Sequence, residues 1–146
     1  MRRHLVAGAG ALVVGVVVAL GSYAVAAGDD SAPALGPGPV VVRLAIDHSR
    51  FSTDRIVVRV GTTVHFDVVN DDPIVHELII GDDEVHRRHE QGTEAHHPAV
   101  PGEVTVGPNE RGHTVFTFDA PGEVVFACHL PGHVAYGMTG VIEVIE

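Results

Sequence analysis

Three residues near the C-terminus carry side chains that bind soft metal ions. Cys128 is the only cysteine, His133 follows it after four intervening residues, and Met138, the only methionine besides Met1, follows after four more. A thiolate, an imidazole and a thioether on one short loop form a soft ligand set, which suits copper in both of its oxidation states. A zinc site would not require the thioether. The spacing therefore predicts a copper site on this loop.

A trigonal copper site needs a second imidazole, which must come from elsewhere in the chain. His76 is the best candidate, because it follows the turn at residues 70–73 and begins a strand, from which it can reach a loop at one end of a sandwich. The alternatives are His65, which alternates outward from Phe66, and His113, which follows a turn. We expect both of these side chains to face solvent.

The candidate ligands also have ordinary structural interpretations. Cys128 could be a buried core thiol, and Met138 could fill a gap in the core without binding metal. We favour ligand roles for both, because an exported protein gains little from a lone thiol and because their spacing to His133 suits a site. His129 follows Cys128 directly, so its side chain should point to the opposite side of the extended chain. We expect it beside the site or at the surface.

From Val40 onward, short runs of β-forming residues alternate with turns that contain glycine, proline or asparagine. The run at 62–70 shows the pattern best, since Val64, Phe66 and Val68 share one face. The sequence predicts seven or eight strands, and hence an all-β sandwich or small barrel. The expected strands are Val40–Ile46, Arg55–Val60, Thr62–Asn70, Ile74–Ile80, Glu103–Val106, His113–Phe118, Gly122–Ala127 and Thr139–Ile145.

The order of these residues resembles that of the cupredoxins, the type 1 (blue) copper proteins, over about residues 40–146. The resemblance lies in Asn70, His76, the Cys128-x4-His133-x3-Gly137-Met138 loop and the Ala-Pro-Gly at 120–122 before the cysteine strand. It implies a Greek-key β-sandwich that binds one copper, with His76, Cys128 and His133 as equatorial ligands and Met138 as the axial ligand. Within the family, the sequence most resembles bacterial plastocyanin-like cupredoxins associated with copper tolerance. Glu77 departs from the family pattern, because plastocyanin and azurin have asparagine there to support the cysteine loop.

The N-terminus has the composition of an export segment. Arg2 and Arg3 precede an uncharged run that reaches Ala27, and Ala24-Val25-Ala26 fits a cleavage site. The run is also long enough to span a bilayer, so residues 1–27 are predicted to be a signal peptide or an N-terminal membrane anchor. Either alternative places the domain outside the cytoplasm, in the periplasm, secreted, or at the outer face of the membrane. Residues 28–39, rich in Pro and Gly, are predicted to form a flexible linker.

Composition excludes several classes of protein. The formal net charge is −10 and the chain has no lysine, so it lacks the basic surface that nucleic-acid phosphates require. One cysteine cannot form an internal disulfide, a four-cysteine zinc site or an iron–sulfur cluster. Multicopper oxidases need His-x-His pairs, which this chain lacks, and the binuclear copper centre of cytochrome oxidase needs two cysteines. With every ligand position filled by the protein, we do not expect an enzyme.

Residues 82–102, following Gly81, lack β character and are predicted to be an insertion at one end of the sandwich. Asp82 or Asp83 could cap a short helix that ends by Gly92. Four histidines and one glutamate of the insertion could hold a weak second metal ion, and the alternative, which we favour, is a solvated acidic loop. These residues are His86, His89, Glu90, His96 and His97.

Two functions remain open at this point. An exported, monomeric type 1 copper protein could carry single electrons, with the negative charge favouring a cationic redox protein as partner. Alternatively, it could sequester copper outside the cytoplasm and so confer resistance, without an obligatory redox partner. The histidines of the insertion and Glu77 fit the second function.

Overall fold

The computed structural model describes residues 33–92 and 99–146, which form nine strands and one helix. The predicted export segment and the first part of the predicted linker lie outside the described residues. The elements, in chain order, are β1 Gly38–Asp47, β2 Arg50–Phe51, β3 Arg55–Arg59, β4 Thr62–Asn70, β5 His76–Gly81, α1 Asp83–Glu90, β6 Glu103–Val106, β7 Arg111–Phe118, β8 Gly122–Ala127 and β9 Thr139–Ile145.

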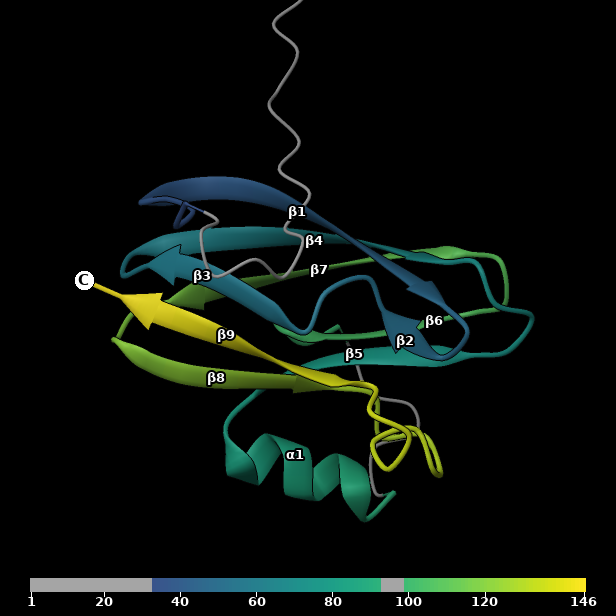
Figure 1. The fold of residues 1–146 in the computed structure, drawn as a ribbon. Coiled ribbons are helices and arrows are strands. Elements are labelled where there is room, and N and C mark those ends of the chain that lie inside the picture. The colour runs from purple at the N-terminus through teal and green to yellow at the C-terminus, as the bar shows by residue number, and fades with distance from the viewer. Residues whose placement is uncertain (1–32, 93–98) are drawn as a thin grey trace, which may run out of the picture.

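The strands form two packed sheets, as Figure 1 shows. One sheet has the order β2-β1-β4-β7, and the other has the order β3-β9-β8-β5-β6. The β1–β4 and β3–β9 pairs are parallel, and the remaining pairs are antiparallel. The prediction of an all-β sandwich is confirmed. Because β5 pairs with β8, the first residue of β5 and the loop that follows β8 lie at the same end of one sheet.

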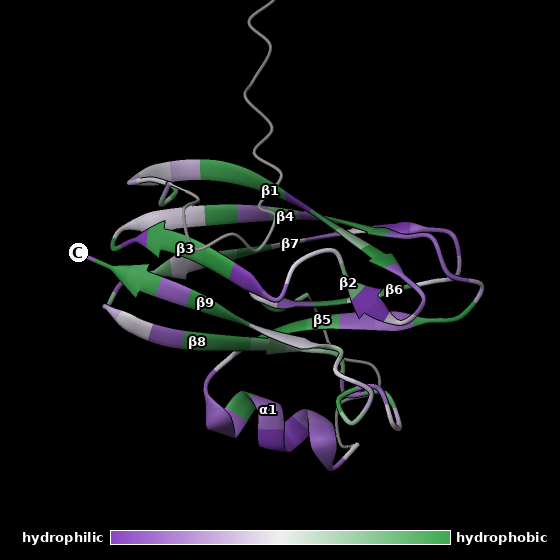
Figure 2. Ribbon diagram, viewed as in Figure 1, coloured by the Kyte–Doolittle hydropathy of each residue, from purple (hydrophilic) through white to green (hydrophobic). Residues whose placement is uncertain are grey.

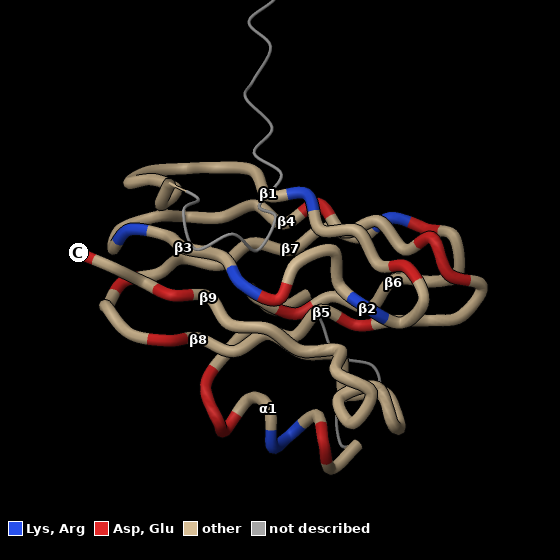
Figure 3. The backbone as a smooth tube through the Cα atoms, viewed as in Figure 1, with Lys and Arg blue, Asp and Glu red and all other residues tan. Residues whose placement is uncertain are grey.

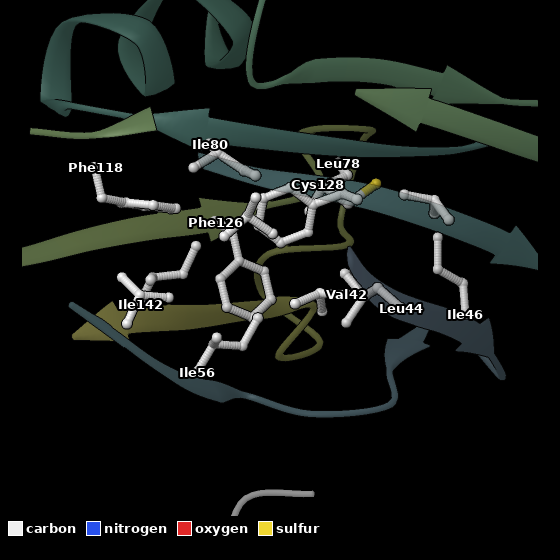
Figure 4. Close-up of a cluster of buried hydrophobic side chains, with 14 of the residues drawn as sticks. Val42, Leu44, Ile46, Ile56, Leu78, Ile80, Phe118, Phe126, Cys128 and Ile142 are labelled. Atoms are coloured by element: carbon white, nitrogen blue, oxygen red, sulfur yellow. The ribbon is translucent and has the colours of Figure 1, made fainter. Parts of the chain in front are cut away.

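The core lies between the two sheets and follows from alternation along the strands. Val64, Phe66 and Val68 of β4 are fully buried, whereas His65 and Asp67 between them are only partly buried. Figure 2 shows the apolar residues concentrated on the strands and the polar ones on α1 and the turns. The side chains in Figure 4 come from both sheets and fill the space between them. Burial of these side chains supplies the main driving force for the fold.

Four predicted strands match the observed bounds, and others differ at their ends. β5 begins at His76 rather than Ile74, because the Asn70 side chain donates a hydrogen bond to the carbonyl of Ile74 at 2.7 Å and extends the preceding turn. β7 begins at Arg111 rather than His113, because its pairing with β4 continues to Val69. β2 was not expected, since two residues give no periodic signal.

The C-terminal part of the predicted linker is built into the sandwich, so the prediction of a flexible segment up to residue 39 is wrong there. β1 already begins at Gly38. Leu35 pairs with β3 through two backbone hydrogen bonds, from its N–H to the carbonyl of Val57 and from the N–H of Arg59 to its carbonyl. Its side chain packs against the core. A single leucine among prolines and glycines shows no strand periodicity, and its partners, the edge of β3 and the Thr62 hydroxyl, are distant in sequence.

The predicted helix of the insertion is present. The Asp82 side chain accepts a hydrogen bond from the Val85 N–H at 3.0 Å, which caps the first turn, and the helix ends at Glu90. The α1 helix packs against β5 on the outer face of the five-stranded sheet (Figure 1). Within residues 33–92 and 99–146, no helix has the length and apolar character needed to cross a membrane.

Candidate metal centre

Three of the four predicted ligands meet at one end of the sandwich. His76 is the first residue of β5, Cys128 directly follows β8, and His133 lies in the loop between β8 and β9. One ligand atom from each lies within 4.8 Å of the other two, and this is the one group of three or more such residues found in the described part of the chain. The Cys128 Sγ lies 3.2 Å from His133 Nδ1, and the centroids of the two imidazoles are 4.9 Å apart.

The buried imidazole of His76 is oriented for metal binding. Its Nε2 lies 2.8 Å from a carboxylate oxygen of Asp72, which can only accept, so Nε2 carries the proton. Its Nδ1 is buried and has no hydrogen-bond partner among the described residues. A buried nitrogen lone pair without a partner is costly unless something else binds it. The donor set and this unpaired nitrogen therefore fit a metal ion between His76, Cys128 and His133.

The Cys128 thiol is held within the core cluster at the edge of the site. Burial raises the pKa of this thiol, and backbone hydrogen bonds from Glu77 and Leu130 only partly offset the effect. A metal ion must therefore displace a proton to bind the sulfur. The Glu77 backbone N–H lies 3.4 Å from Sγ. Because this donor belongs to the main chain, glutamate in place of the family's asparagine leaves the bond to the sulfur intact.

The loop from Cys128 to Met138 is closed by its own backbone. The Cys128 N–H donates to the Met138 carbonyl at 3.1 Å, and the Met138 N–H donates to the His133 carbonyl at 3.0 Å. Gly137 has a φ of 89°, a conformation that glycine adopts without strain, and this permits the turn just before Met138. Met138 itself is completely buried in the core cluster. Its predicted role as axial ligand stays a prediction.

Comparison with known proteins identifies the family. A family model of copper binding proteins, the plastocyanin/azurin family, matches residues 40–145. The chain belongs to this family. The copper-resistant cuproprotein CopI of Rubrivivax gelatinosus is 37% identical over 101 residues, which cover 67% of this chain and 61% of that protein. The match therefore spans less than two thirds of the length of CopI.

Solved structures of related folds support the same assignment. Reduced auracyanin from Roseiflexus castenholzii superposes with a TM-score of 0.61 at 24% identity, over 76% of this chain and 98% of that one. Auracyanin A from Chloroflexus aurantiacus superposes with a TM-score of 0.58 at 24% identity, over 73% of this chain and 99% of that one. At this level of identity the likeness shows the shared cupredoxin fold, which matches the fold predicted from the sequence.

Sequence reasoning missed two polar residues behind this cupredoxin site. Asn70, which is 1% exposed, donates to the carbonyls of Ile74 and Gly107 and accepts from the N–H of Asp72, so it fixes the turn before His76. Asp72 is buried against His76 itself. Asn70 was interpreted as a turn former and as part of the family pattern, and Asp72 only as a member of the turn, so neither was given a role in the site. A carboxylate four residues before a candidate ligand histidine, in a turn that places it close, is the signal that could have indicated Asp72.

The described histidines of the insertion do not form a preassembled second site. Nε2 of His89 lies 3.0 Å from the Glu103 carboxylate, and both side chains are buried. Nδ1 of His86 lies 2.8 Å from Nε2 of His129, and its Nε2 lies 3.2 Å from the carbonyl of Val125. His129 therefore points to the outer side of the sheet, away from the Cys128 thiol, as predicted. His96 and His97 lie outside the described residues.

The two histidines that were alternatives to His76 as the second imidazole do not join the site. His65 and His113 stack on each other with ring centroids 5.8 Å apart, across the pairing of β4 with β7. They project from positions of β4 and β7 that alternate with core residues, on the sheet that does not contain Cys128. His76 is thus the imidazole that the fold brings to Cys128 and His133.

Proposed function

We propose that this cupredoxin is an exported protein that binds one copper ion in a mononuclear type 1 site and transfers single electrons outside the cytoplasm. The observation that supports the site most strongly is the convergence of His76, Cys128 and His133, together with the buried, unpaired Nδ1 of His76. Two imidazoles and one thiolate are the trigonal ligand set of blue copper sites. Membership in the plastocyanin/azurin family supports the same metal.

The residues of the site have distinct roles in this proposal. His76 and His133 present nitrogen lone pairs, Cys128 presents the thiolate, and Met138 supplies a weak axial thioether. Bound copper supplies a reversible one-electron couple at this place. The rigid strand ends and the backbone-closed loop limit the rearrangement between the two oxidation states. Because protein atoms occupy all four ligand positions, no position is left for a substrate, and we propose no enzymatic activity.

The surface around His133 fits a transient redox partner. His133 is partly exposed, and its loop carries Val134, 39% exposed, and Tyr136, 73% exposed. Small apolar patches of this kind suit weak electron-transfer encounters. The chain has a net charge of −10, and Figure 3 shows acidic positions distributed over strands, turns and α1. We propose a cationic protein partner and a monomeric carrier, with an association rate that falls as salt increases. A rate independent of salt would contradict the charge part of this proposal.

The absorption spectrum of the copper-loaded protein tests the site. We expect an intense thiolate-to-copper band in the visible range, one copper per chain, and loss of the band in the Cys128→Ser variant. His129→Gln is the matched control, because it changes the neighbouring residue, which points away from the thiol. It should leave the band in place. A band that survives Cys128→Ser would overturn the ligand assignment.

Copper sequestration is the second candidate, and the likeness to the copper-resistant cuproprotein CopI favours it. Two measurements in a strain lacking the gene separate the candidates. If the protein carries electrons, loss of the gene should reduce electron flux at low copper, and Cys128→Ser should not restore it. If it sequesters copper, flux should be normal at low copper, and growth should fail only when copper is added.

The mature N-terminus tests the proposed export. Mass spectrometry of the protein purified from its host should find a chain that starts near Gly28 if residues 1–27 are cleaved. A peptide containing Met1–Arg3 in a membrane fraction would instead identify a retained anchor. Full-length protein in the cytoplasm would contradict the proposed location.

A further inference from the structure

The Asp72 carboxylate lies behind the copper-ligand position and has a full set of hydrogen-bond donors around it. It is 7% exposed. Oδ1 accepts from the His48 N–H at 2.8 Å, and Oδ2 accepts from the Ser49 N–H at 2.7 Å and from His76 Nε2 at 2.8 Å. Burial raises the pKa of this carboxyl, but the hydrogen bonds from Ser49, His48 and His76 outweigh it and hold the pKa below the ordinary value. With N–H donors directed at both of its oxygens, the group is arranged to accept hydrogen bonds as a carboxylate.

This contact determines which nitrogen of His76 is available. A carboxylate without a proton accepts only, so the shared proton resides on Nε2 and the lone pair resides on Nδ1. Because Nε2 is bonded to Asp72 and Nδ1 has no partner, Nδ1 is the ring nitrogen that remains for a metal ion beside Cys128 and His133. The same contact fixes the orientation of the ring, because the His76 side chain is fully buried and its Nε2 is hydrogen-bonded to Asp72.

We propose that Asp72 is a positioning residue of the metal site, which sets the tautomer of His76 and stabilises oxidised over reduced copper. The proposal rests on the proposed function, since it takes His76 as a copper ligand. A carboxylate bonded to the far nitrogen of a ligating imidazole makes that imidazole a stronger donor. The cupric ion carries one more positive charge than the cuprous ion, so it gains more from the stronger donor and from the nearby anion. Asp72 therefore lowers the reduction potential of the site.

A second feature shows that the carboxylate is held in place rather than merely close. His48 and Ser49 both have positive φ, 52° and 54°, and they form the tight turn between β1 and β2. Non-glycine residues adopt this conformation at a cost, which persists only where the surroundings impose it. Asp72 binds the N–H groups of both residues. The turn and the ligand histidine are thus clamped by one side chain.

The substitution Asp72→Asn tests the electronic role with the least disturbance. With its carbonyl oxygen in the place of Oδ2, asparagine can still accept from Ser49 and from His76. It loses the negative charge, and its NH2 group replaces the acceptor that the His48 N–H binds. Asp71→Asn is the matched control, because Asp71 is the neighbouring residue, is exposed, and its only described hydrogen bond here is through its backbone, to Ile46. Both variants remove one charge, and only one of them touches the ligand histidine.

Redox titration of the copper-loaded proteins should then separate the variants. We expect Asp72→Asn to shift the ratio of Cu(II) to Cu(I) affinity toward Cu(I) by about 10-fold to 100-fold. Each factor of ten corresponds to about 59 mV for a one-electron couple. Asp71→Asn should change the potential by much less. If Asp72→Asn lowers the thermal midpoint but leaves the potential equal to that of Asp71→Asn, Asp72 is only an anchor of the turn and the proposal is overturned.

Nitrogen-15 NMR of the copper-free protein gives a readout that is independent of copper. In the wild type, the His76 ring should show a protonated Nε2 and an unprotonated Nδ1. In Asp72→Ala, if it folds, the two tautomers should mix, and an unchanged tautomer there would contradict the proposal. Should the tautomer behave as expected in a protein that binds no copper, the proposed function fails while the positioning role stands.

Discussion

The two histidine-rich regions of this molecule differ in what their ring nitrogens contact. At the end of the sandwich, His76 lies beside Cys128 and His133, and its Nδ1 is buried without a described partner. Beside α1, His86 is bonded to His129 and to a carbonyl, and His89 is bonded to a buried glutamate. The first region gathers a thiol and two imidazoles within 4.8 Å of one another, one of them with an unpaired nitrogen. The second region uses its imidazoles to attach the helix to the sheet, and Nδ1 of His129 is its one buried nitrogen without a partner among the described residues.

The comparison shows that the number of histidines is a poor guide to metal binding. The insertion has more histidines than the C-terminal loop, yet its described members have protein partners already. A metal ion there would have to compete with those hydrogen bonds, and the loss of a buried partner costs about 1–3 kcal/mol. At the sandwich end, a metal ion would instead bind a nitrogen that has no partner and that has a thiol and a second imidazole close by.

The largest difference should appear in copper affinity. His76→Ala removes a ligand, so we expect copper affinity to fall by more than about 100-fold, beyond the effect of losing a residue that only supports a ligand. His86→Ala should leave both the affinity and the stoichiometry of one copper per chain unchanged. Equilibrium dialysis of the two variants measures this. A second copper per wild-type chain that disappears in His86→Ala would break the comparison, because the insertion would then hold metal.

The reverse difference should appear in stability. His89→Ala removes a hydrogen-bond partner from the Glu103 carboxylate, which is 2% exposed, so we expect unfolding free energy to fall by about 1–3 kcal/mol. Arg88 also lies 3.4 Å from Glu103, which keeps the cost below that of an isolated buried charge.

Urea unfolding of the copper-free protein gives the stability value. His89→Gln is the control, since its amide can still donate to the carboxylate and should recover part of the loss. The visible band of the copper-loaded variant should be unaltered. A change in that band would show that the helix region influences the metal site.

A smaller effect should follow from the helix cap. Asp82→Ala removes the acceptor for the Val85 N–H, and we expect a loss of about 1 kcal/mol in copper-free protein. Asp82→Asn, which keeps a cap acceptor, should lose less. The measurement is again urea unfolding, combined with hydrogen exchange at the first turn of α1. Equal exchange rates in Asp82→Ala and the wild type would mean that the sheet, and not the cap, holds the helix end.

The smallest effect on stability should come from a surface ion pair outside both histidine-rich regions. Arg55 and Glu143 form an ion pair between β3 and β9, with side chains 37% and 38% exposed. Because water and salt screen such a pair, Arg55→Gln should cost less than about 1 kcal/mol and should not alter copper binding. A thermal melt at low and high salt checks this. A large loss that persists at high salt would indicate that packing of the Arg55 side chain matters more than its charge.

Much of the fold could be predicted from local patterns. Alternation along the run at residues 62–70 gave its strand and its buried face, since Val64, Phe66 and Val68 lie in the core. The cap at Asp82 and the turn before Met138 also follow from residue type, because aspartate caps helices and glycine tolerates positive φ. The parts that were not predicted depend on partners distant in sequence. Leu35, for example, is held by the edge of β3 and by the Thr62 hydroxyl.

The candidate site likewise has a part that residue types predicted and a part that depends on the tertiary structure. Residue types and spacing alone predicted a soft ligand set of Cys128, His133 and Met138, because the chemistry of a thiolate, an imidazole and a thioether does not depend on the fold. The sequence favoured His76 over His65 and His113, and the tertiary structure brings the His76 imidazole to Cys128 and His133 through the pairing of β5 with β8. The tertiary structure also decided that the histidines beside α1 bind protein groups, and that Asp72 fixes which nitrogen of His76 is free. Hydrogen-bond direction depends on which groups meet in space, and no spacing along the chain specifies that.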